Sequence, residues 1–429
     1  MSKIPESRFF VYRHGRLHCE AIELSQIAKE VGTPCYVYSW NAIREAYNSI
    51  DRALAPGPHL VAYAAKANGN LALLRRLAQL GSGADIVSGG ELARAMEAGI
   101  RPDRIVFSGV GKTDREIESA LAAGVRSIHA ESPAELDAIE AIAARMGRPA
   151  PVSLRVNPEV DPKTHPYIAT GLRQSKFGIS MDAARALLPR ILGSAQLQLE
   201  GLACHIGSLI GSSEAVGQAT EAVARMAVEF KRAGAPIRTL DAGGGWPIAY
   251  GHEANAPEPY SAFGAAIRAA LVRSGAEQHN LELIIEPGRS IVGDAGVLLT
   301  QVVFVKEQFD KRFVIVDGAM TELLRPALYK AYHAIVPVQA PAAEAALTPA
   351  DLVGPVCESG DFLAQDRPLP PLARGDLIAI RGAGAYAACM ASTYNSRPRA
   401  AEVLVDGNLH HVIRRRERVE DLWRDEQMR

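Results

Sequence analysis

The sequence is poor in cysteine and has no excess of charge of either sign. Its five cysteines are an odd number, and no two have the C-x-x-C spacing typical of metal and redox sites. We therefore expect free thiols in a reducing compartment and no metal site. Lys and Arg total 47 and Asp and Glu 48, so the net charge of -1 gives no electrostatic basis for binding nucleic acid or a membrane surface.

Long hydrophobic runs are missing as well. No uninterrupted apolar stretch reaches the roughly 18 residues that a membrane helix needs, and residues 1–10 show no secretory signal. The chain has 429 residues, 48% of them hydrophobic, which is enough to bury large cores and to form two domains. We expect a soluble, cytoplasmic protein with no nucleic-acid or membrane partner.

The sequence does contain a regular alternation of strand-like and helix-like segments. Eight apolar, β-rich runs are predicted strands: 59–66, 84–88, 104–108, 127–130, 152–157, 202–208, 239–243 and 283–286. Segments with helical periodicity alternate with them: 71–80, 91–98, 114–123, 133–146, 181–192, 214–233 and 260–274. This pattern predicts an α/β fold with a parallel (β/α)8 barrel over residues 41–293, and a doubly wound sheet is the alternative. Ser132 and Glu135, at the start of one helix, have the spacing of a capping box.

Both ends of the chain differ from this middle part. After residue 289 the predicted strands are 297–306, 313–316, 353–357, 377–380, 401–405 and 410–413, and 340–351 is an expected exposed loop. Before the barrel, 9–12 and 16–17 suggest a hairpin, 24–28 a short helix and 35–38 a strand. We predict a second, mostly β domain made of residues 1–40 and 294–429, so that it includes the N-terminal strands.

Polar residues stand at the ends of several predicted barrel strands. The C-terminal strand ends of a barrel carry its chemistry, and here they carry Lys66, Ser88, Ser108, Asn157, His205, Ser208, Gly243 to Gly245, Glu286 and Arg289. Taken alone, Lys66 is more simply a solvated lysine beside a turn, and His205 a satisfied core histidine. Their occurrence together at one rim favours a functional site.

The segment from Glu286 to Arg289 is the most informative of these. A carboxylate that ends an apolar strand is costly to bury unpaired, and arginine binds phosphate or carboxylate through two hydrogen bonds. The Gly243–Gly245 run is either a plain loop or a cradle whose backbone N–H groups approach an anion. With Lys66 and a ring-stacking His205, these features suggest pyridoxal 5'-phosphate, bound to the lysine amine and kept protonated at its ring nitrogen by the glutamate.

The predicted β domain holds further candidates. Cys357, alone, is more simply a small buried apolar residue. Arg325 and Tyr329 are four residues apart and adjacent if helical, which suits a binding pair or surface packing equally. The glycine-rich segment that ends in Tyr386 also stands out.

Several motifs together resemble those of a known family. They are Tyr63-Ala64-Ala65-Lys66-Ala67-Asn68, the 107–113 segment from Phe107 to Thr113, Thr170-Gly171 with the 175–179 segment, His205-Ile206-Gly207-Ser208, the triple glycine, Glu286 to Arg289, Arg325 to Tyr329, and Cys357-Glu358-Ser359-Gly360-Asp361. In this combination the chain resembles the pyridoxal-phosphate-dependent decarboxylases of the alanine-racemase-like barrel fold over nearly its whole length.

The resemblance implies a role for each matching residue. Lys66 would form the Schiff base with pyridoxal 5'-phosphate, His205 would stack on its ring, and Glu286 would pair with its pyridine nitrogen. The phosphate would be surrounded by Ser208, Gly243, Gly244, Gly245, Gly288, Arg289 and Tyr386. The substrate would be held by Arg289, Arg325, Tyr329, Glu358 and Tyr386, with Cys357 as the proton donor. In the family, residues like Cys357 and Glu358 reach the site of the other subunit, which implies a homodimer with shared active sites.

The resemblance also implies a substrate. Arginines for a distal carboxylate and Glu358 for a distal ammonium suit meso-2,6-diaminopimelate, which would lose carbon dioxide to give L-lysine in lysine biosynthesis. Trp246-Pro247 departs from the family after the triple glycine and leaves a second reading open. That reading is a related decarboxylase for another or modified amino acid, of the ornithine, lysine or arginine type or linked to a carrier or siderophore. A non-catalytic, cofactor-binding regulatory homologue is the alternative of a different class.

Overall fold

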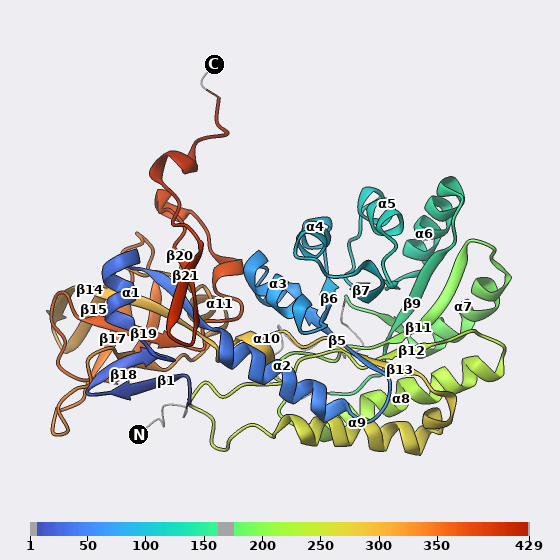
Figure 1. The fold of residues 1–429 in the computed structure, drawn as a ribbon, viewed down its shortest axis with the longest axis horizontal. Helices are drawn as coiled ribbons and strands as arrows, with labels where there is room; N and C mark the ends of the chain where they lie inside the picture. The colour runs from blue at the N-terminus through green and yellow to red at the C-terminus, as the bar shows by residue number, and fades with distance from the viewer. Residues whose placement is uncertain (1–6, 162–175, 428–429) are drawn as a thin grey trace. The chain divides into compact units, whose positions relative to one another are not determined.

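The structure is a computed structural model that describes residues 7–161 and 176–427. The motif residues Thr170, Gly171 and Ser175 lie outside the described residues. The chain divides into two compact units (Figure 1). One is made of residues 47–247 and 257–290, and the other of residues 1–46, 248–256 and 291–429.

The first unit is a closed barrel of parallel strands. Among the described residues, eight strands form it: β5 (His59–Ala64), β6 (Gly83–Ile86), β7 (Ile105–Phe107), β8 (Ser127–Ala130), β9 (Ala150–Asn157), β11 (Leu197–Ala203), β12 (Thr239–Asp241) and β13 (Glu282–Ile285). Each pairs in parallel with the next, and β13 pairs with β5 to close the ring. The predicted barrel is confirmed, and the doubly wound alternative is wrong, because an open sheet has two unpaired edges. The short β10 (Ile179–Ser180) pairs with β9 beside the ring.

Helices follow the barrel strands, as the periodicity predicted. They are α3 (Leu71–Gln79), α4 (Gly89–Glu97), α5 (Asp114–Ala123), α6 (Pro133–Met146), α7 (Met181–Gly193), α8 (Ser213–Arg232) and α9 (Tyr260–Ser274) (Figure 1). The predicted capping box at α6 is half formed. The Ser132 hydroxyl accepts the Glu135 N–H at 3.1 Å, but the Glu135 carboxylate accepts the Glu131 N–H and the Lys112 ammonium instead.

Helix α2 (Trp40–Leu54) was not predicted. It precedes β5, and it buries Ile43, Tyr47, Ile50 and Leu54. These apolar residues recur at the spacing of one helical face. Polar and charged residues such as Asn41, Arg44, Glu45, Asn48, Ser49, Asp51 and Arg52 separate these apolar positions, so the segment does not stand out as an apolar run.

The second unit is mostly β structure, and its sheet combines both ends of the chain. The N-terminal elements are β1 (Phe10–Arg13), β2 (Arg16–Cys19), β3 (Ile22–Glu23), α1 (Leu24–Val31) and β4 (Cys35–Ser39). Strand β4 lies between β14 (Gly296–Gln308), antiparallel to it, and β20 (Ala401–Asp406), parallel to it. The other strands are β15 (Lys311–Val316), β16 (Ile335–Pro337), β17 (Thr348–Val353), β18 (Phe362–Leu369), β19 (Leu377–Arg381) and β21 (Leu409–Arg414). The prediction that the β domain includes the N-terminal strands is confirmed.

The prediction for residues 340–369 was partly wrong. A strand was expected at 353–357 and an exposed loop at 340–351, but β17 begins at Thr348 and ends at Val353. Strands β16 and β18 were not predicted. Pro349 and Pro368 stand opposite each other in the β17–β18 pair. Proline is uncommon inside strands because it has no N–H to donate to the neighbouring strand. The two prolines therefore made strands β17 and β18 hard to predict from composition.

In the described part of the chain, no helix is both long and apolar enough to cross a membrane.

Candidate active site

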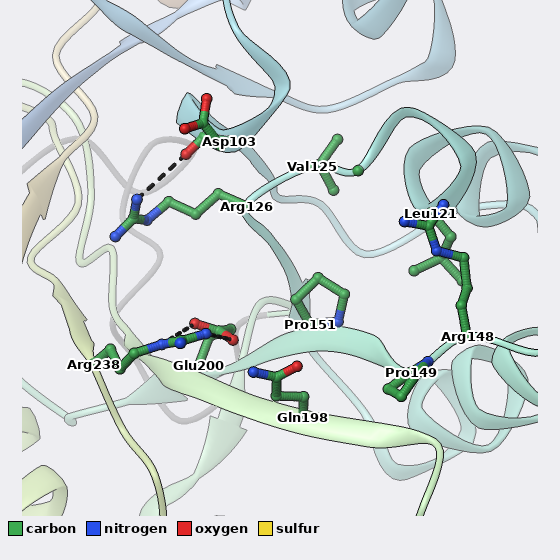
Figure 2. Close-up of a pocket in the computed structure, with 11 residues that line it drawn as sticks. Asp103, Leu121, Val125, Arg126, Arg148, Pro149, Pro151, Gln198, Glu200 and Arg238 are labelled. Atoms are coloured by element: carbon green, nitrogen blue, oxygen red, sulfur yellow. Dashed lines mark hydrogen bonds and ion pairs between the residues drawn. The ribbon is translucent and has the colours of Figure 1, made fainter.

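The two ends of the barrel differ in chemistry. A cavity of about 560 Å³ lies where the strands begin, lined by residues such as Arg126, Glu200 and Arg238 (Figure 2). Its charges are largely matched within the barrel itself. The Arg238 Nε donates to Glu200 Oε2 at 3.0 Å, and Arg126 pairs with Glu282. Salt bridges between side chains therefore cover this end of the barrel. Reactions in such barrels take place at the opposite end, where the strands finish.

At the opposite end, the C-terminal strand ends gather a set of polar side chains. Listed in chain order, they are Lys66, Asp85, Ser108, His129, His205, Asp241, Glu286 and Arg289. Most are buried, which is unusual for ionisable residues unless they are paired or functional. The structure thus places predicted residues beside Asp85, His129 and Asp241, to which the sequence analysis gave no role.

Lys66 is ion-paired at this rim. It lies in the single 3-10 turn Ala65–Ala67 directly after β5, and its Nζ is 2.5 Å from Asp85 Oδ2. The Asp85 side chain is fully buried, while that of Lys66 is 36% exposed. The simpler interpretation, a lysine solvated beside a turn, does not account for this buried partner. The sequence analysis missed Asp85 because the residue lies inside an apolar run that was interpreted only as a strand. The signal was present, since an isolated aspartate in a buried strand is costly unless it is paired.

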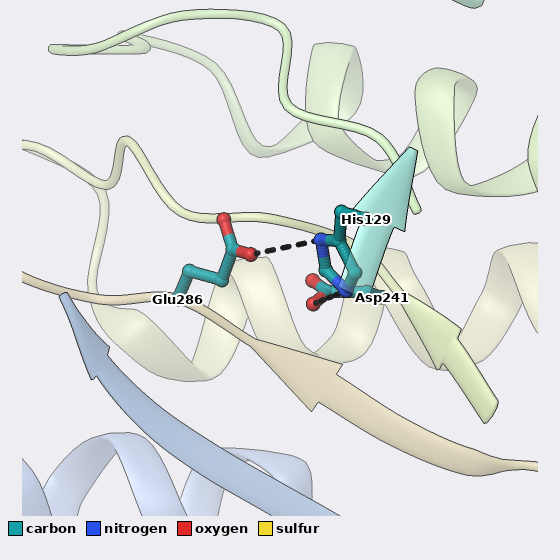
Figure 3. Close-up of side chains that lie close together, drawn as sticks. All are labelled: His129, Asp241 and Glu286. Carbon is teal, nitrogen blue, oxygen red and sulfur yellow. Dashed lines mark ion pairs between the residues drawn. The ribbon is translucent and has the colours of Figure 1, made fainter. Parts of the chain in front are cut away.

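Glu286 lies in a buried cluster with Ser108, His129 and Asp241. The Ser108 Oγ is 3.2 Å from Glu286 Oε1 and 3.1 Å from His129 Nδ1. The His129 ring stands between the two carboxyl groups, with Nδ1 3.8 Å from Glu286 Oε1 and Nε2 3.9 Å from Asp241 Oδ2 (Figure 3). The cluster therefore holds two acids and an imidazole out of contact with water.

Burial dominates the ionisation of this cluster. It raises the pKa of Glu286 well above the usual range, and the neighbouring carboxyls of Asp241 and Asp85 raise it further. Burial likewise raises the pKa of Asp241 to about 7. The pKa of His129 falls to about 3, first through burial and then through the positive charge of Lys112. At neutral pH the imidazole is therefore uncharged.

His205 lies against the glycine loop. Its Nδ1 accepts the N–H of Gly244 at 3.1 Å, which fixes the ring orientation. Burial lowers the pKa of His205 well below its usual value, so this ring is neutral as well. A Cβ on Gly244 would collide with the Glu286 carbonyl, and one on Gly243 would collide with the Cys204 carbonyl. These positions need glycine because neighbouring backbones approach too closely for a side chain.

Arg289 and Gly288 continue the same rim. The Arg289 Nη2 donates to Ser208 Oγ at 3.1 Å, which brings a guanidinium and a hydroxyl to one place. A Cβ on Gly288 would lie 2.9 Å from the Ala67 Cβ and 3.1 Å from the Ala64 Cβ. Gly288 thus allows the Glu286–Arg289 segment to pack on the residues that flank Lys66.

Trp246 is taken up by the barrel wall. It is 1% exposed, and its ring stacks on Phe263 of α9 with centroids 5.0 Å apart. Tyr260 of the same helix lies 6.0 Å away. The indole ring therefore packs between the glycine loop and α9. This removes the reason for expecting Trp246 to reshape the substrate mouth.

In the β-rich unit, Arg325 is buried and held in place. It begins helix α11 (Arg325–Tyr329) and is 4% exposed. Its Nη1 is 2.7 Å from His333 Nε2, and the other nitrogen of His333 is 2.8 Å from the Arg381 carbonyl. Because arginine only donates, His333 accepts at Nε2 and donates from Nδ1, as a neutral imidazole. Tyr250 adds a cation–π contact 4.8 Å from the guanidinium carbon.

Cys357 and Glu358 lie on an exposed turn. The Cys357 N–H donates to Asn395 Oδ1 at 2.8 Å, and both Cys357 and Glu358 are exposed in this chain. Asp361 anchors the turn, because its two oxygens accept the N–H groups of Val356 and Met320, each at 2.7 Å. The expectation that Cys357 is a buried apolar residue is therefore wrong.

Tyr386 follows the glycine-rich segment 382–384 and adopts a left-handed backbone conformation, with φ of 54°. A Cβ on Gly384 would collide with the Val292 carbonyl, so the segment packs closely on the last residue of α10 (Arg289–Val292). Tyr386 itself is partly buried.

The barrel rim has the donors and acceptors that pyridoxal 5'-phosphate requires. It has a buried carboxyl that could bind a ring nitrogen, a lysine amine, and a guanidinium, a hydroxyl and a glycine loop that could bind a phosphate. Within the described residues, Asp85 Oδ1 and Asp241 Oδ2 are buried without a hydrogen-bond partner, which marks a site built for more than the protein alone.

Comparisons with known proteins point the same way. Residues 40–293 match the family model "Pyridoxal-dependent decarboxylase, pyridoxal binding domain". The chain is 48% identical to the diaminopimelate decarboxylase of Pseudomonas aeruginosa, over 98% of this chain and 99% of that protein. It also resembles the crystal structure of diaminopimelate decarboxylase from Helicobacter pylori complexed with L-lysine, with 43% identity, a TM-score of 0.89 and coverage of 94% and 99%. The M. jannaschii diaminopimelate decarboxylase, in co-complex with L-lysine, gives a TM-score of 0.93 at 35% identity, covering 98% of both chains.

Proposed function

This chain belongs to the pyridoxal-dependent decarboxylases, and we propose that it converts meso-2,6-diaminopimelate to L-lysine and carbon dioxide with pyridoxal 5'-phosphate. One observation carries the substrate: relatives 42% to 48% identical over nearly their full length are named diaminopimelate decarboxylases. We further propose that it works in the cytoplasm, for which the odd set of five free cysteines is the support.

The barrel residues would hold the cofactor. Bound there, pyridoxal 5'-phosphate supplies an electron sink for the bond that loses carbon dioxide. Lys66 would link to it through the amine that now pairs with Asp85. His205 would lie against the ring and Glu286 would bind its nitrogen. Ser208, Gly243, Gly244, Gly245, Gly288, Arg289 and Tyr386 would enclose the phosphate.

Two clusters of opposite charge would hold the far end of the substrate. Arg325, with Arg289 and Tyr329, would bind the distal carboxylate, and Tyr386 would contribute a hydroxyl. Glu358 would bind the distal ammonium. A molecule with a complete amino-acid group at each end satisfies both clusters, whereas ornithine or lysine leaves the buried Arg325 without its anion.

Cys357 would return the proton that replaces the lost carboxyl group. Its thiol is exposed in this chain, as is Glu358, so neither is sequestered by its own fold. We propose a homodimer in which these two residues complete the site of the partner subunit, as the resemblance implied. A regulatory homologue would have no need to keep both Lys66 and Cys357.

The test of the reaction is a substrate panel. Purified protein with pyridoxal 5'-phosphate is given meso-diaminopimelate, L-ornithine, L-lysine and L-arginine in turn, and carbon dioxide release is followed with amino-acid analysis of the products. We expect L-lysine from diaminopimelate and negligible release from the others. Release from another amino acid, with none from diaminopimelate, would contradict the proposal and favour the related decarboxylase.

A further inference from the structure

A single hydroxyl hydrogen in the barrel has two buried acceptors. The Ser108 Oγ lies 3.2 Å from Glu286 Oε1 and 3.1 Å from His129 Nδ1, and all three residues are buried. A serine hydroxyl can donate to only one of them at a time, while its lone pairs accept from the other side. The direction of its hydrogen bond therefore depends on which neighbour carries a proton.

Burial and the nearby charges all act on the ionisation of Glu286, and burial, the largest influence, raises its pKa. The carboxyls of Asp241 and Asp85 oppose its ionisation, while Lys66 and Arg155 favour it. His129, the remaining neighbour, is neutral and adds no charge. A cation beside Glu286, such as a pyridine ring that has taken up a proton there, would favour the carboxylate.

The backbone at His129 is held in place by Lys112. The Lys112 ammonium is fully used, since it donates to the carbonyls of His129 and Gly109 at 2.7 Å and to Glu135 at 2.8 Å. It therefore ties the end of β8 to the loop after Ser108. The backbone that carries the imidazole is thereby held in place, and the Ser108 hydroxyl, which turns about a single bond, is the adjustable part.

We propose that Ser108, backed by His129, is a reversible hydrogen-bond switch that partners Glu286 in both of its protonation states. While Glu286 is protonated, its O–H donates to Ser108 Oγ, and the Ser108 hydroxyl donates to His129 Nδ1. When Glu286 gives this proton to the pyridine nitrogen of the cofactor, the glutamate O–H bond breaks and an N–H bond forms, with no other proton needed. The Ser108 hydroxyl then turns to donate to the new carboxylate. Ser108 and His129 are thus positioning residues, and the inference rests on the proposed cofactor.

The test measures cofactor affinity and the protonation of its ring nitrogen. In Ser108→Ala the carboxylate loses a charge-assisted hydrogen bond, so we expect the Kd for pyridoxal 5'-phosphate to rise roughly tenfold or more. The NMR shift of cofactor labelled at the pyridine nitrogen should move towards that of the unprotonated ring. Ser127→Ala is the matched control, because the Ser127 hydroxyl is equally buried and bonds to Ser153 at 2.7 Å without touching Glu286.

A double-mutant cycle separates this role from packing. In a Glu286→Gln background no proton can be given to the ring, so adding Ser108→Ala should raise the Kd by no more than about twofold. All samples are first dialysed against a chelator, because the ligand atoms of His129, Asp241 and Glu286 lie within 4.8 Å of one another, close enough to hold a metal ion. If Ser108→Ala does not unfold cooperatively, Ser108→Cys replaces it, with the same directions and smaller effects.

The outcomes are distinct. A wild-type Kd and ring-nitrogen shift in Ser108→Ala would overturn the switch, and so would an equal loss in Ser127→Ala. Additive losses in the cycle would show that Ser108 acts apart from Glu286, which also overturns it. A wild-type chain that binds no pyridoxal 5'-phosphate would instead contradict the proposed function itself.

Discussion

At the scale of single residues, the sequence analysis located groups that stand out by type and spacing. Lys66, His205 and Glu286 lie at or near the C-terminal ends of predicted strands, and strand ends are easy to find. Asp85 and His129 lie inside their strands, where alternation makes them look like ordinary buried positions. Their partners come from other strands of the ring, so only the closed barrel reveals what they contact.

Replacing Lys66 tests the most basic assignment. Lys66→Ala should bind pyridoxal 5'-phosphate without a covalent bond and so lose the visible absorption of the linked cofactor. Absorption spectra of the dialysed protein, with mass spectrometry after borohydride reduction, check this. Lys112 is a second buried amine in the same barrel. An unchanged spectrum in Lys66→Ala would therefore contradict the assignment, and mapping of the reduced adduct would show whether Lys112 carries the link instead.

Asp241 should make the cofactor-free protein less stable as pH rises. Its pKa is raised from 3.8 to about 7 in the folded state, chiefly by burial. The unfolded chain releases this proton near pH 4, whereas the folded chain keeps it until about pH 7. Folding stability is therefore full below about pH 4 and falls between there and about pH 7, by about 4 kcal/mol.

Asp241→Asn should flatten that decline. Asparagine keeps the oxygen that accepts the Gly243 N–H at 2.8 Å but cannot ionise. Urea unfolding of both proteins across this pH range checks it. Parallel stability curves for the two proteins would mean that Asp241 does not carry the proton.

His333 offers a prediction about substrate affinity. His333→Phe removes the acceptor that fixes Arg325, so we expect KM for diaminopimelate to rise roughly tenfold with a smaller change in kcat. His252→Phe is the control, because His252 is partly exposed and stacks on Tyr332. A fall in kcat alone, at unchanged KM, would contradict the positioning of Arg325.

At the scale of elements, prediction succeeded where the pattern is repetitive. Most barrel strands and the helices between them were expected within a few residues of their observed bounds, because buried parallel strands are apolar runs and the helices are amphipathic. The exception is β11, which was expected at 202–208 and lies at Leu197–Ala203. It failed for β16, β17 and β18, where prolines stand in paired strands and side-chain bonds shape the connecting turn. Such turns depend on contacts distant in sequence, such as that of Met320 with Asp361.

The turn that carries Cys357 should depend on Asp361. Asp361→Ala leaves the N–H groups of Val356 and Met320 without their acceptors, so the turn should lose its fixed shape. We expect turnover to fall at least tenfold while cofactor affinity stays unchanged. Steady-state rates measure the turnover, and titration with pyridoxal 5'-phosphate measures the cofactor affinity. If the cofactor affinity falls as much as the turnover, the variant is generally unfolded and the prediction fails.

At the scale of the whole molecule, the proposed chemistry is divided between the two compact units. The groups proposed for the cofactor belong mainly to the barrel, and Arg325, Tyr329, Cys357 and Glu358 belong to the β-rich unit. Sequence patterns predict each unit from its own periodicity, but they carry no information on which subunit completes a site. Symmetric pairing of two chains is the usual solution for soluble enzymes.

Mixing two inactive variants tests that division. Lys66→Ala lacks the proposed cofactor link and Cys357→Ala lacks the proposed proton donor, so each variant alone should be nearly inactive. If the donor comes from the partner, mixed dimers have one site with both residues intact, and random exchange should restore about a quarter of wild-type turnover. Lys66→Ala mixed with a chain that carries both substitutions is the control, since none of its dimers contains an intact Lys66. Exchange of subunits without any recovery of turnover, verified by native mass spectrometry, would place Cys357 and Lys66 of the same chain in one site.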